Sequence, residues 1–237
     1  MIVEEWPRRV AALGQFHVES PERPELDKAS EHHLRKVLRA SSGEEIVVTN
    51  GRGSWSLCVV TDTGLERVSD VHVDPETPTT TLYVTPLKGD RGEWAVAKAT
   101  EVGVGRIVPL LSQHMVVKFK GEAREKILAR WRRIGADVAG QCRRTYDVVI
   151  EEPVRIADVP LDVGVAHFAG GGDWGGLRAV AIGPEGGWAD DEWDASRRFV
   201  SLGPSVLRAE TASVVAASLL AFQAGGWGFT LRGQGYE

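Results

Sequence analysis

The spacing of apolar residues changes near residue 80 and gives the chain two patterns. Before it, short runs at 45–49, 55–61 and 68–73 have the composition of strands, with apolar and β-branched residues between polar turns. The residues that join the first two runs, NGRGS, are a strong hairpin signal. A short helix is expected through 32–38, with Ser30 as its cap. We therefore predict a small β-rich domain at 1–75.

From Thr80 onward, apolar strands alternate with helices. Strands are expected at 81–87, 107–111, 163–169, 179–182 and 199–202. Helices are expected at 93–102, at about 122–140, from about 190 with Asp190 as its cap, and after Glu210. This alternation indicates an α/β domain with a parallel sheet and helices on both faces. The polar segment DPETPT (74–79) is the predicted linker, so this domain is expected to span 76–237.

Composition narrows the class of protein. The chain has 237 residues, 43% hydrophobic and 26% charged, which is the mix of an ordinary globular protein. No run approaches the roughly 18 apolar residues of a membrane span, and the first residues lack the order of a signal peptide. We therefore expect a cytoplasmic protein with no membrane contact. Cys58 and Cys142 have no metal-type spacing, so no metal site is predicted.

Charge is unevenly distributed along the chain. The net charge of −5 argues mildly against a nucleic-acid partner. Between Lys118 and Arg144, however, nine Lys or Arg stand against three Asp or Glu. Three of these basic residues follow helical spacing: Lys126, Arg130 and Arg133. Such a stripe is either a solvated face or a track for phosphates.

Two glycine-rich loops follow predicted strands and have the composition of a binding site. The first follows Ile182 in AVAIGPEGGW (179–188), where glycines allow a ligand to approach the backbone. The second lies in LGPSVLRAETA (202–212) and presents Arg208 and Glu210 before an apolar helix. Because α/β folds bind ligands at such strand ends, we expect both loops to line one pocket.

A third glycine-rich stretch, GGGDWGG (170–176), does not predict a nucleotide site. It matches neither the dinucleotide fingerprint nor the phosphate-binding loop. We interpret it as a flexible turn, and the missing fingerprint argues against a Rossmann dehydrogenase or a Rossmann-type methyltransferase.

The two loops and three further segments resemble the RsmE family, 16S ribosomal RNA (uracil-N3)-methyltransferases of the SPOUT superfamily. The further segments are HHLRKVLR (32–39), PLKGDRGEWAVAKATEVGVGRIVPL (86–110) and QCRR (141–144). All five occur in the family's order over nearly the whole chain. The resemblance implies an N-terminal PUA-like β-barrel that helps to hold RNA. It also implies a SPOUT domain with a deep trefoil knot that binds S-adenosylmethionine without a metal, in a homodimer whose subunits complete the active site.

The resemblance implies methylation of a uridine in the 16S rRNA of the small ribosomal subunit. The N3 atom of uracil is a poor nucleophile while it is protonated, so the proton must leave or the resulting anion must be stabilised. Arg208 and Arg144 match family arginines and are our candidates for stabilising that anion or positioning RNA. Glu210 is the candidate general base or organiser of the helix start.

The other candidate residues fall into two groups. For cofactor binding they are Phe168, Ile182, Gly183, Gly187, Leu202, Gly203, Val206, Leu207 and Thr211. For RNA binding they are Arg35, Arg39, Lys88, Lys126, Arg130 and Arg133. Departures from the family pattern occur at Gly140, Arg143, Tyr146 and Ala189 and concern the RNA-facing surface more than the cofactor pocket.

Two alternatives stay open. One is a SPOUT methyltransferase that acts on tRNA or on another rRNA position. The other is a non-catalytic RNA-binding protein that uses only the barrel and the basic helix. The intact glycine loops disfavour the non-catalytic protein, and the segments HHLRKVLR and KGDR favour the RsmE-type enzyme over another SPOUT enzyme.

Overall fold

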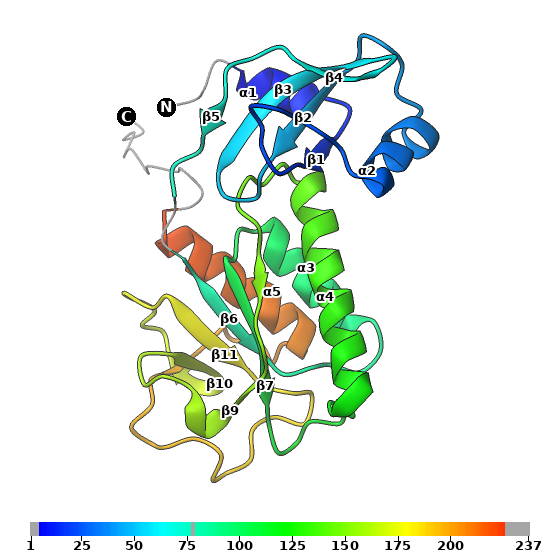
Figure 1. Ribbon diagram of the computed structural model, residues 1–237. Coiled ribbons are helices and arrows are strands. Elements are labelled where there is room, and N and C mark those ends of the chain that lie inside the picture. Colours follow the sequence, from blue (N-terminus) through cyan, green and yellow to red (C-terminus); the bar gives the residue numbers. More distant parts are fainter. Residues whose placement is uncertain (1–4, 77–78, 226–237) are drawn as a thin grey trace, which may run out of the picture. The chain divides into compact units, whose positions relative to one another are not determined.

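The computed structural model describes residues 5–76 and 79–225 (Figure 1), which form two compact units. Unit 1 holds the described residues up to Glu76 together with Gly135–Asp147, and unit 2 holds those from 79 to Ile134 and from Val148 onward. In the described part of the chain, no helix is long and apolar enough to cross a membrane.

Unit 1 is built on one small sheet with the order β1–β2–β3–β4, and β5 also pairs with β3. The strands are β1 (Gln15–His17), β2 (Glu45–Thr49), β3 (Ser54–Thr61), β4 (Gly64–Arg67) and β5 (His72–Val73). The hairpin predicted between the first two runs is confirmed. Its turn is held by the side-chain carbonyl of Asn50, which accepts from the N–H groups of Arg52 and Ser54 at 2.9 and 3.2 Å. Phe16, Ile46 and Cys58 contribute to the core below the sheet.

Two sequence predictions for unit 1 are wrong. The strand expected at 68–73 is replaced by β4 and the short β5, because a tight turn at Thr61–Gly64 returns the chain directly along β3. The short helix α2 (Lys28–His32) is capped by Asp27 and not by Ser30, since the Asp27 carboxylate accepts the Ser30 N–H at 2.7 Å. The helix α1 (Trp6–Ala11) was not predicted.

Residues 135–147 join unit 1 through a polar network around Asp74. The Arg9 side chain, only 3% exposed, donates to the Asp74 carboxylate at 2.8 Å and to the backbone carbonyl of Arg143. The same carboxylate accepts from the Trp55 ring N–H at 2.9 Å and from the Thr145 hydroxyl at 2.7 Å. Asp74, the first residue of the expected linker, is therefore bonded to several parts of unit 1. Residues 77–78 of that linker lie outside the described residues.

Unit 2 contains a parallel sheet, as the sequence predicted. Its order is β12–β10–β11–β6–β7–β8, with β9 also paired to β7. The strands are β6 (Thr81–Val84), β7 (Arg106–Leu111), β8 (Val149–Ile150), β9 (Val154–Arg155), β10 (Gly164–Gly171), β11 (Ala179–Ile182) and β12 (Phe199–Val200). The helices are α3 (Arg91–Glu101), the 3-10 helix η2 (Ile156–Asp158), α5 (Ala209–Gln223) and, as far as Ile134, α4 (Gly121–Gln141).

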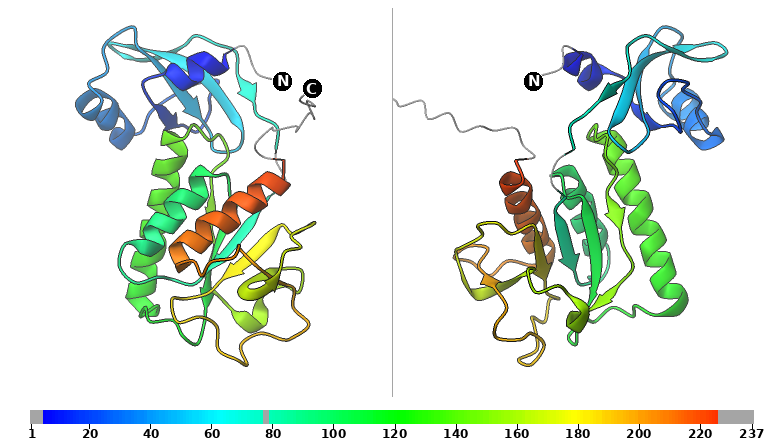
Figure 2. Two further views of the ribbon diagram at one scale, coloured as in Figure 1. Left: turned by 180° about the vertical axis from the view of Figure 1, so that it is seen from behind. Right: turned by 60° about the vertical axis from the view of Figure 1, so that its left-hand side comes forward.

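The sheet of unit 2 buries alternate residues in two different clusters. Leu82, Val84 and Ile182 belong to the cluster that includes residues of α3, α4 and α5. Figure 2 shows α5 lying beside α3 over the sheet. Tyr83 and Ala181, which point the other way, contact a cluster that contains η2 and the segment around Trp193. In the described residues, this second cluster therefore has a 3-10 helix and a loop where α-helices were expected.

The helix expected from about 190 does not form. The Glu192 carboxylate instead accepts the N–H groups of Ala189 at 3.0 Å and of Gln113 at 2.5 Å. The Asp194 carboxylate accepts the Ser196 N–H at 2.8 Å. Side-chain contacts of Glu192 and Asp194 thus accompany a series of turns in this segment.

Candidate active site

The loops of interest follow the carboxyl ends of neighbouring parallel strands. β6 ends at Val84, β7 at Leu111, β11 at Ile182 and β12 at Val200. Because these strands are parallel, their carboxyl ends lie along one edge of the sheet, where α/β proteins bind ligands. The sequence-predicted loops at 183–188 and 201–208 both start from this edge.

Side-chain contacts hold the 183–188 loop to its neighbours. The Trp188 ring N–H donates to the carbonyl of Ala166 on β10 at 3.0 Å, and its ring lies over Gly183, where an added Cβ would come within 3.0 Å of it. Glu185 forms an ion pair with Arg91 at 2.9 Å. A ring nitrogen of His114 lies 3.2 Å from the carbonyl oxygen of Gly187. The loops after β6, β7 and β11 are therefore one connected cluster.

The 201–208 loop is held by its own hydrogen bonds. The carbonyl of Ser201 accepts from the Trp174 ring N–H at 2.9 Å, and the Ser201 hydroxyl bonds to the backbone of Gly203. Leu202 and Leu207 pack against the core of unit 2, whereas Val206 is 89% exposed. The loop thus has one buried side and one side free to contact a ligand.

Two glycines leave open space above the backbone of these loops. Gly187 has φ +73° and Gly203 has φ +125°, conformations that side chains rarely adopt. A Cβ added at either position would meet no described atom within 4 Å. A ligand can therefore approach the peptide backbone at both positions.

The start of α5 presents two charged residues without partners. Arg208 is the N-cap in an extended conformation, and its exposed guanidinium makes no ion pair or hydrogen bond to the described residues. The Oε2 atom of Glu210 is buried and has no hydrogen-bond donor in the described chain. A buried carboxylate oxygen without a donor is costly, so this arrangement fits a site whose ligand supplies the missing donor.

Most of the predicted cofactor residues lie at the ends of two strands of this sheet. Ile182 is the last residue of β11, and Gly183 and Gly187 follow it. Those that follow β12 or begin α5 are Leu202, Gly203, Val206, Leu207 and Thr211. Phe168 lies on β10, next to the position where its pairing with β12 shifts register, and is 80% exposed. Its ring stacks on His167, with the ring centroids 4.4 Å apart.

Arg144 lies in unit 1. Its Nε donates to the carbonyl of Tyr146 at 3.1 Å, and its own carbonyl accepts from the Gln15 side chain. Burial lowers the pKa of the Arg144 guanidinium. In this unit Arg144 helps to hold the 142–147 segment, and its catalytic role stays a prediction.

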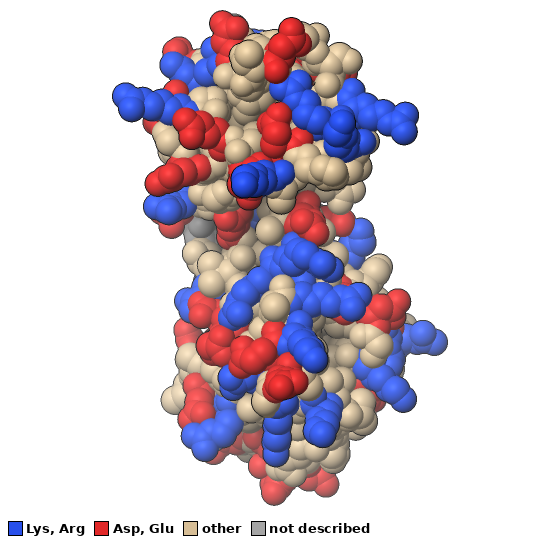
Figure 3. All heavy atoms as spheres, turned by 45° about the vertical axis from the view of Figure 1, so that its right-hand side comes forward, with Lys and Arg blue, Asp and Glu red and all other residues tan. Residues whose placement is uncertain are grey.

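The basic residues of α4 are exposed and partly neutralised. Figure 3 shows Lys and Arg side chains gathered over this face with Asp and Glu among them. Arg130 pairs with Glu93 at 2.6 Å and Lys126 approaches Glu122 at 3.9 Å. Arg133 has no ion-pair partner among the described residues. It is therefore the member of this group most available to a phosphate.

The three remaining RNA candidates have different surroundings. Arg35 bonds to Glu31 and to the carbonyl of Thr61, so its guanidinium is engaged within unit 1. Arg39 is exposed in a left-handed conformation with φ +56°. Lys88 is exposed in the loop after β6, where its N–H lies 3.4 Å from the Glu185 carboxylate.

Sequence reasoning missed Arg91, His114 and Glu192. Arg91 and His114 contact the 183–188 loop from positions far away in the sequence. Glu192 lies in the segment that was wrongly predicted as a helix. One usable signal existed for the first two: Arg91 and His114 are polar residues shortly after a strand end, where parallel sheets position functional groups.

Possible metal ligands and the buried thiol of Cys58, which lies in unit 1, can be judged within the described part of the chain. The described residues contain no group of three or more His, Cys, Asp or Glu side chains that could hold a metal ion. Burial raises the pKa of the Cys58 thiol to about 11, so this cysteine is protonated at neutral pH.

Comparison with known proteins places these features in context. A family model for an RNA methyltransferase domain matches residues 75–169 and 171–221, and one for an RNA methyltransferase PUA domain matches residues 26–69. Ribosomal RNA small subunit methyltransferase E from Mycobacterium bovis is 30% identical over 82% of this chain and 84% of its own length. The protein of the same name from Bacillus subtilis is 25% identical over 81% of this chain and 87% of its own.

Two solved structures superpose on a similarly large part of this chain. Ribosomal RNA small subunit methyltransferase E from Neisseria gonorrhoeae, bound to S-adenosyl methionine, superposes with a TM-score of 0.69 at 25% identity, covering 88% of this chain and 97% of that one. A Legionella pneumophila protein in complex with the bound cofactor SAM gives a TM-score of 0.75 at 27% identity, covering 88% of this chain and 96% of that one.

Proposed function

The chain belongs to the family of ribosomal RNA small subunit methyltransferase E, and we propose that it transfers a methyl group from S-adenosylmethionine to N3 of a uridine in 16S rRNA. The observation that supports this proposal is that two glycine loops leave the same edge of one parallel sheet, and the second of them leads into Arg208 and the carboxylate of Glu210, whose Oε2 atom has no donor among the described residues. The uracil and its N3 atom are inferred from the match of both loops to the RsmE pattern.

The loops have the features that S-adenosylmethionine requires. Open space above Gly187 and Gly203 gives access to backbone groups, and the half-buried Leu202 and Leu207 offer apolar contacts. The exposed ring of Phe168 is available as a further wall. When bound, the cofactor supplies a methyl group already activated by its sulfonium, so no metal is needed.

The protein's own contribution is to hold the uracil and manage its N3 proton. Arg208 has no ion-pair or hydrogen-bond partner among the described residues, so its guanidinium can bind a uracil carbonyl and stabilise the anion that forms when the proton leaves. Glu210 either accepts that proton or binds a donor of the ligand at the helix start. Both roles use groups that the folded chain leaves unpaired.

RNA binding is proposed to use the basic residues of α4 together with unit 1. Arg133 and Lys126 are exposed on α4, and phosphate contacts from such residues add affinity without reading sequence. The PUA-domain match in unit 1 supports a second RNA contact there. An enzyme that acts on small ribosomal subunits works in the cytoplasm, which is the proposed location.

The exposed apolar side of α5 supports a homodimer. Ala212, Ala216 and Leu220 of this helix are buried in unit 2, while Val215 and Leu219 on another side stay partly exposed. Trp94, 46% exposed, lies on α3, which packs against α5. A partner subunit would cover this apolar surface.

A knotted C-terminal region is part of the same proposal. From β11 the chain crosses to β12 at the sheet edge and then returns, so that α5 packs over β11 and β6. The knot itself is included because SPOUT enzymes, which this chain resembles, thread their C-terminal segment.

Methyl transfer from labelled S-adenosylmethionine tests the activity. The substrate is small subunits from a strain that lacks the modification, and the product nucleoside is identified by mass spectrometry. We expect 3-methyluridine in 16S rRNA. Label in tRNA, or at another atom of the nucleoside, would instead indicate a different SPOUT specificity, and no label with any RNA would indicate a non-catalytic binding protein.

A further inference from the structure

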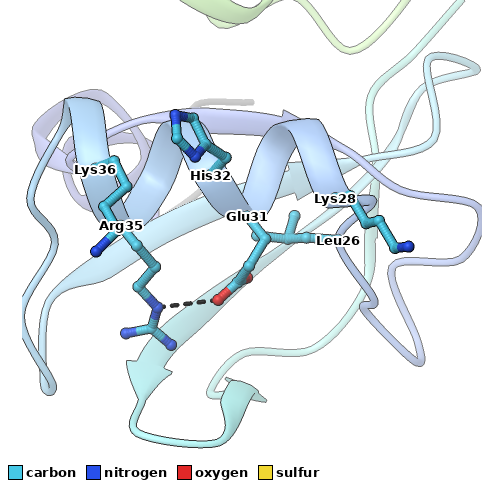
Figure 4. A pocket seen from close by; sticks show the side chains of 6 residues that line it. All are labelled: Leu26, Lys28, Glu31, His32, Arg35 and Lys36. Atoms are coloured by element: carbon cyan, nitrogen blue, oxygen red, sulfur yellow. Dashed lines mark hydrogen bonds and ion pairs between the residues drawn. The ribbon is translucent and has the colours of Figure 1, made fainter.

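A pocket of about 430 Å³ lies beside α2 and the π-helix η1 (His33–Val37) of unit 1 (Figure 4). This volume is within the usual range of small-ligand sites, roughly 300–1,000 Å³. The lining residues are Leu26, Lys28, Glu31, His32, Arg35 and Lys36. Three of them belong to the HHLRKVLR segment, which has no assigned role in methyl transfer.

The π-helix fixes the direction of these side chains. Its widened turn is closed by the Leu38 N–H, which donates to the His33 carbonyl at 3.0 Å. Leu34 is fully buried in the core of unit 1, and the His33 ring packs edge-on against Phe16 with the ring centroids 6.1 Å apart. His32, Arg35 and Lys36, which lie on the other sides of this turn, line the pocket. Short π-helical turns occur frequently at functional sites.

The pocket combines positive charge with apolar contact area. The one carboxylate, Glu31, is already paired with Arg35 at 3.0 Å, and the Arg35 guanidinium also donates to the Thr61 carbonyl. Figure 4 shows this pair between Lys36 on one side and Lys28 on the other. Both lysines are exposed and have no ion-pair partner among the described residues. Leu26 packs against the core and gives the pocket an apolar wall.

We propose that this pocket binds one unstacked nucleotide of the RNA substrate. The base lies against Leu26 and the His32 ring, and Lys28 and Lys36 contact the phosphates on either side. Proteins read single-stranded RNA by stacking splayed bases on rings and holding the backbone with cations. The inference rests on the proposed function for the identity of the RNA, but the binding chemistry depends only on the pocket.

Binding of a labelled oligouridylate to the full-length protein, followed by fluorescence anisotropy at several salt concentrations, tests the pocket. In Lys28→Ala/Lys36→Ala we expect weaker binding and a salt slope reduced by about 1.4, the value for two lost phosphate contacts to a single strand. Arg52→Ala/Arg67→Ala removes the same charge from unit 1 outside the pocket and is the matched control. Its affinity and slope should stay close to those of the unaltered protein.

A second comparison isolates the base contact. His32→Ala should weaken binding of the oligouridylate about tenfold but should not change binding of an oligonucleotide with abasic sugars. Equal losses with both oligonucleotides would overturn the stacking contact. Unchanged affinity and slope in the lysine variant, or an equal loss in its control, would overturn the pocket itself.

The methylation assay separates this inference from the proposed function. If the unaltered protein methylates 16S rRNA and the lysine variant binds RNA normally, only the pocket inference fails. If the unaltered protein methylates no RNA but the lysine and His32 variants lose oligouridylate affinity as expected, the proposed function fails and the pocket stands. A pocket that prefers an acidic peptide of equal charge over the oligouridylate would also overturn the inference.

Discussion

Two oppositely charged side chains at the start of α5 do not pair with each other. Arg208 is exposed and Glu210 keeps one oxygen buried without a donor. Elsewhere in unit 2, acidic side chains such as Glu185 and Glu192 are fully used in holding loops. Arg208 and Glu210 thus lie where the proposed chemistry needs an anion stabiliser and a proton acceptor.

Arg208→Ala should lower the single-turnover rate at saturating RNA by about 100-fold, because stabilisation of a developing charge acts in the transition state. Rapid-quench measurement of methyl transfer checks this. Arg208→Lys should recover little, since an ammonium lacks the planar fork. Loss of RNA affinity with an unchanged saturated rate would assign Arg208 to RNA positioning instead.

Gly187→Ala should weaken S-adenosylmethionine binding, measured by calorimetry. The added methyl group occupies the open space through which the cofactor reaches the backbone. Gly176→Ala is the matched control, because Gly176 has nearly the same φ, +75° against +73°, and equally open surroundings outside the two loops. Both variants carry the same backbone strain. Equal cofactor affinity in the two variants would contradict a site at Gly187.

Asp74→Ala should lower the free energy of unfolding by about 3 kcal/mol, since it leaves the buried Arg9 without its partner. Chemical denaturation with detection of Trp fluorescence measures the loss. Arg8→Ala, which breaks an exposed pair with Glu45, is the control and should cost less than about 1 kcal/mol. Similar losses in both variants would show that the Asp74 network adds no special stability.

The same carboxylate predicts a pH dependence. Burial raises the pKa of Asp74, but hydrogen bonds from Thr145, Arg9 and Trp55 together with the Arg9 charge outweigh it, so the pKa lies below its ordinary value of 3.8. A lowered folded-state pKa stabilises the protein above the unfolded value, and this part of the stability disappears as pH falls below about 4. Asp74→Asn should therefore show a shallower loss of stability in that range.

At the scale of helices and strands, the sequence patterns predicted the elements that depend on interactions between residues close together in the chain. The NGRGS hairpin, α4 and α5 were found because turn residues and apolar spacing act over a few positions. The helix near 190 was wrongly predicted: this segment forms turns whose contacts include one from the Glu192 carboxylate to the N–H of the distant Gln113. The grouping of 135–147 with unit 1 depends on Arg9 and Asp74, which no local pattern connects to Thr145.

The same distinction applies to the candidate site. Its glycines and the charged start of α5 could be read from strand–loop–helix order. The partners of Glu185 and Gly187 could not be read in this way, because Arg91 and His114 reach them from segments that follow other strands of the sheet. Exposure also differed within one predicted group: Arg35 is engaged by Glu31, whereas Arg39 is exposed.

Within α4, Arg133→Ala should weaken RNA binding more than Arg130→Ala. Arg130 must give up its ion pair with Glu93 to contact a phosphate, whereas Arg133 has no such pair among the described residues. Salt-dependent binding measurements on the two variants provide the comparison. The triple variant with Lys126 should also flatten the salt dependence while cofactor affinity stays intact. An equal effect of the two arginines would show that the Glu93 pair does not restrain Arg130.

At the scale of the whole molecule, the exposed apolar side of α5 predicts a homodimer at micromolar concentration by light scattering. Leu219→Arg places a charge on this side and should shift the mass to that of a monomer, because a desolvated, unpaired charge opposes association. Leu161→Arg is the control, since Leu161 is 76% exposed elsewhere in unit 2. If two subunits complete the active site, Leu219→Arg should also lose methyl transfer while its circular dichroism stays unchanged. A monomeric unaltered protein that is fully active would refute both the dimer and a shared site.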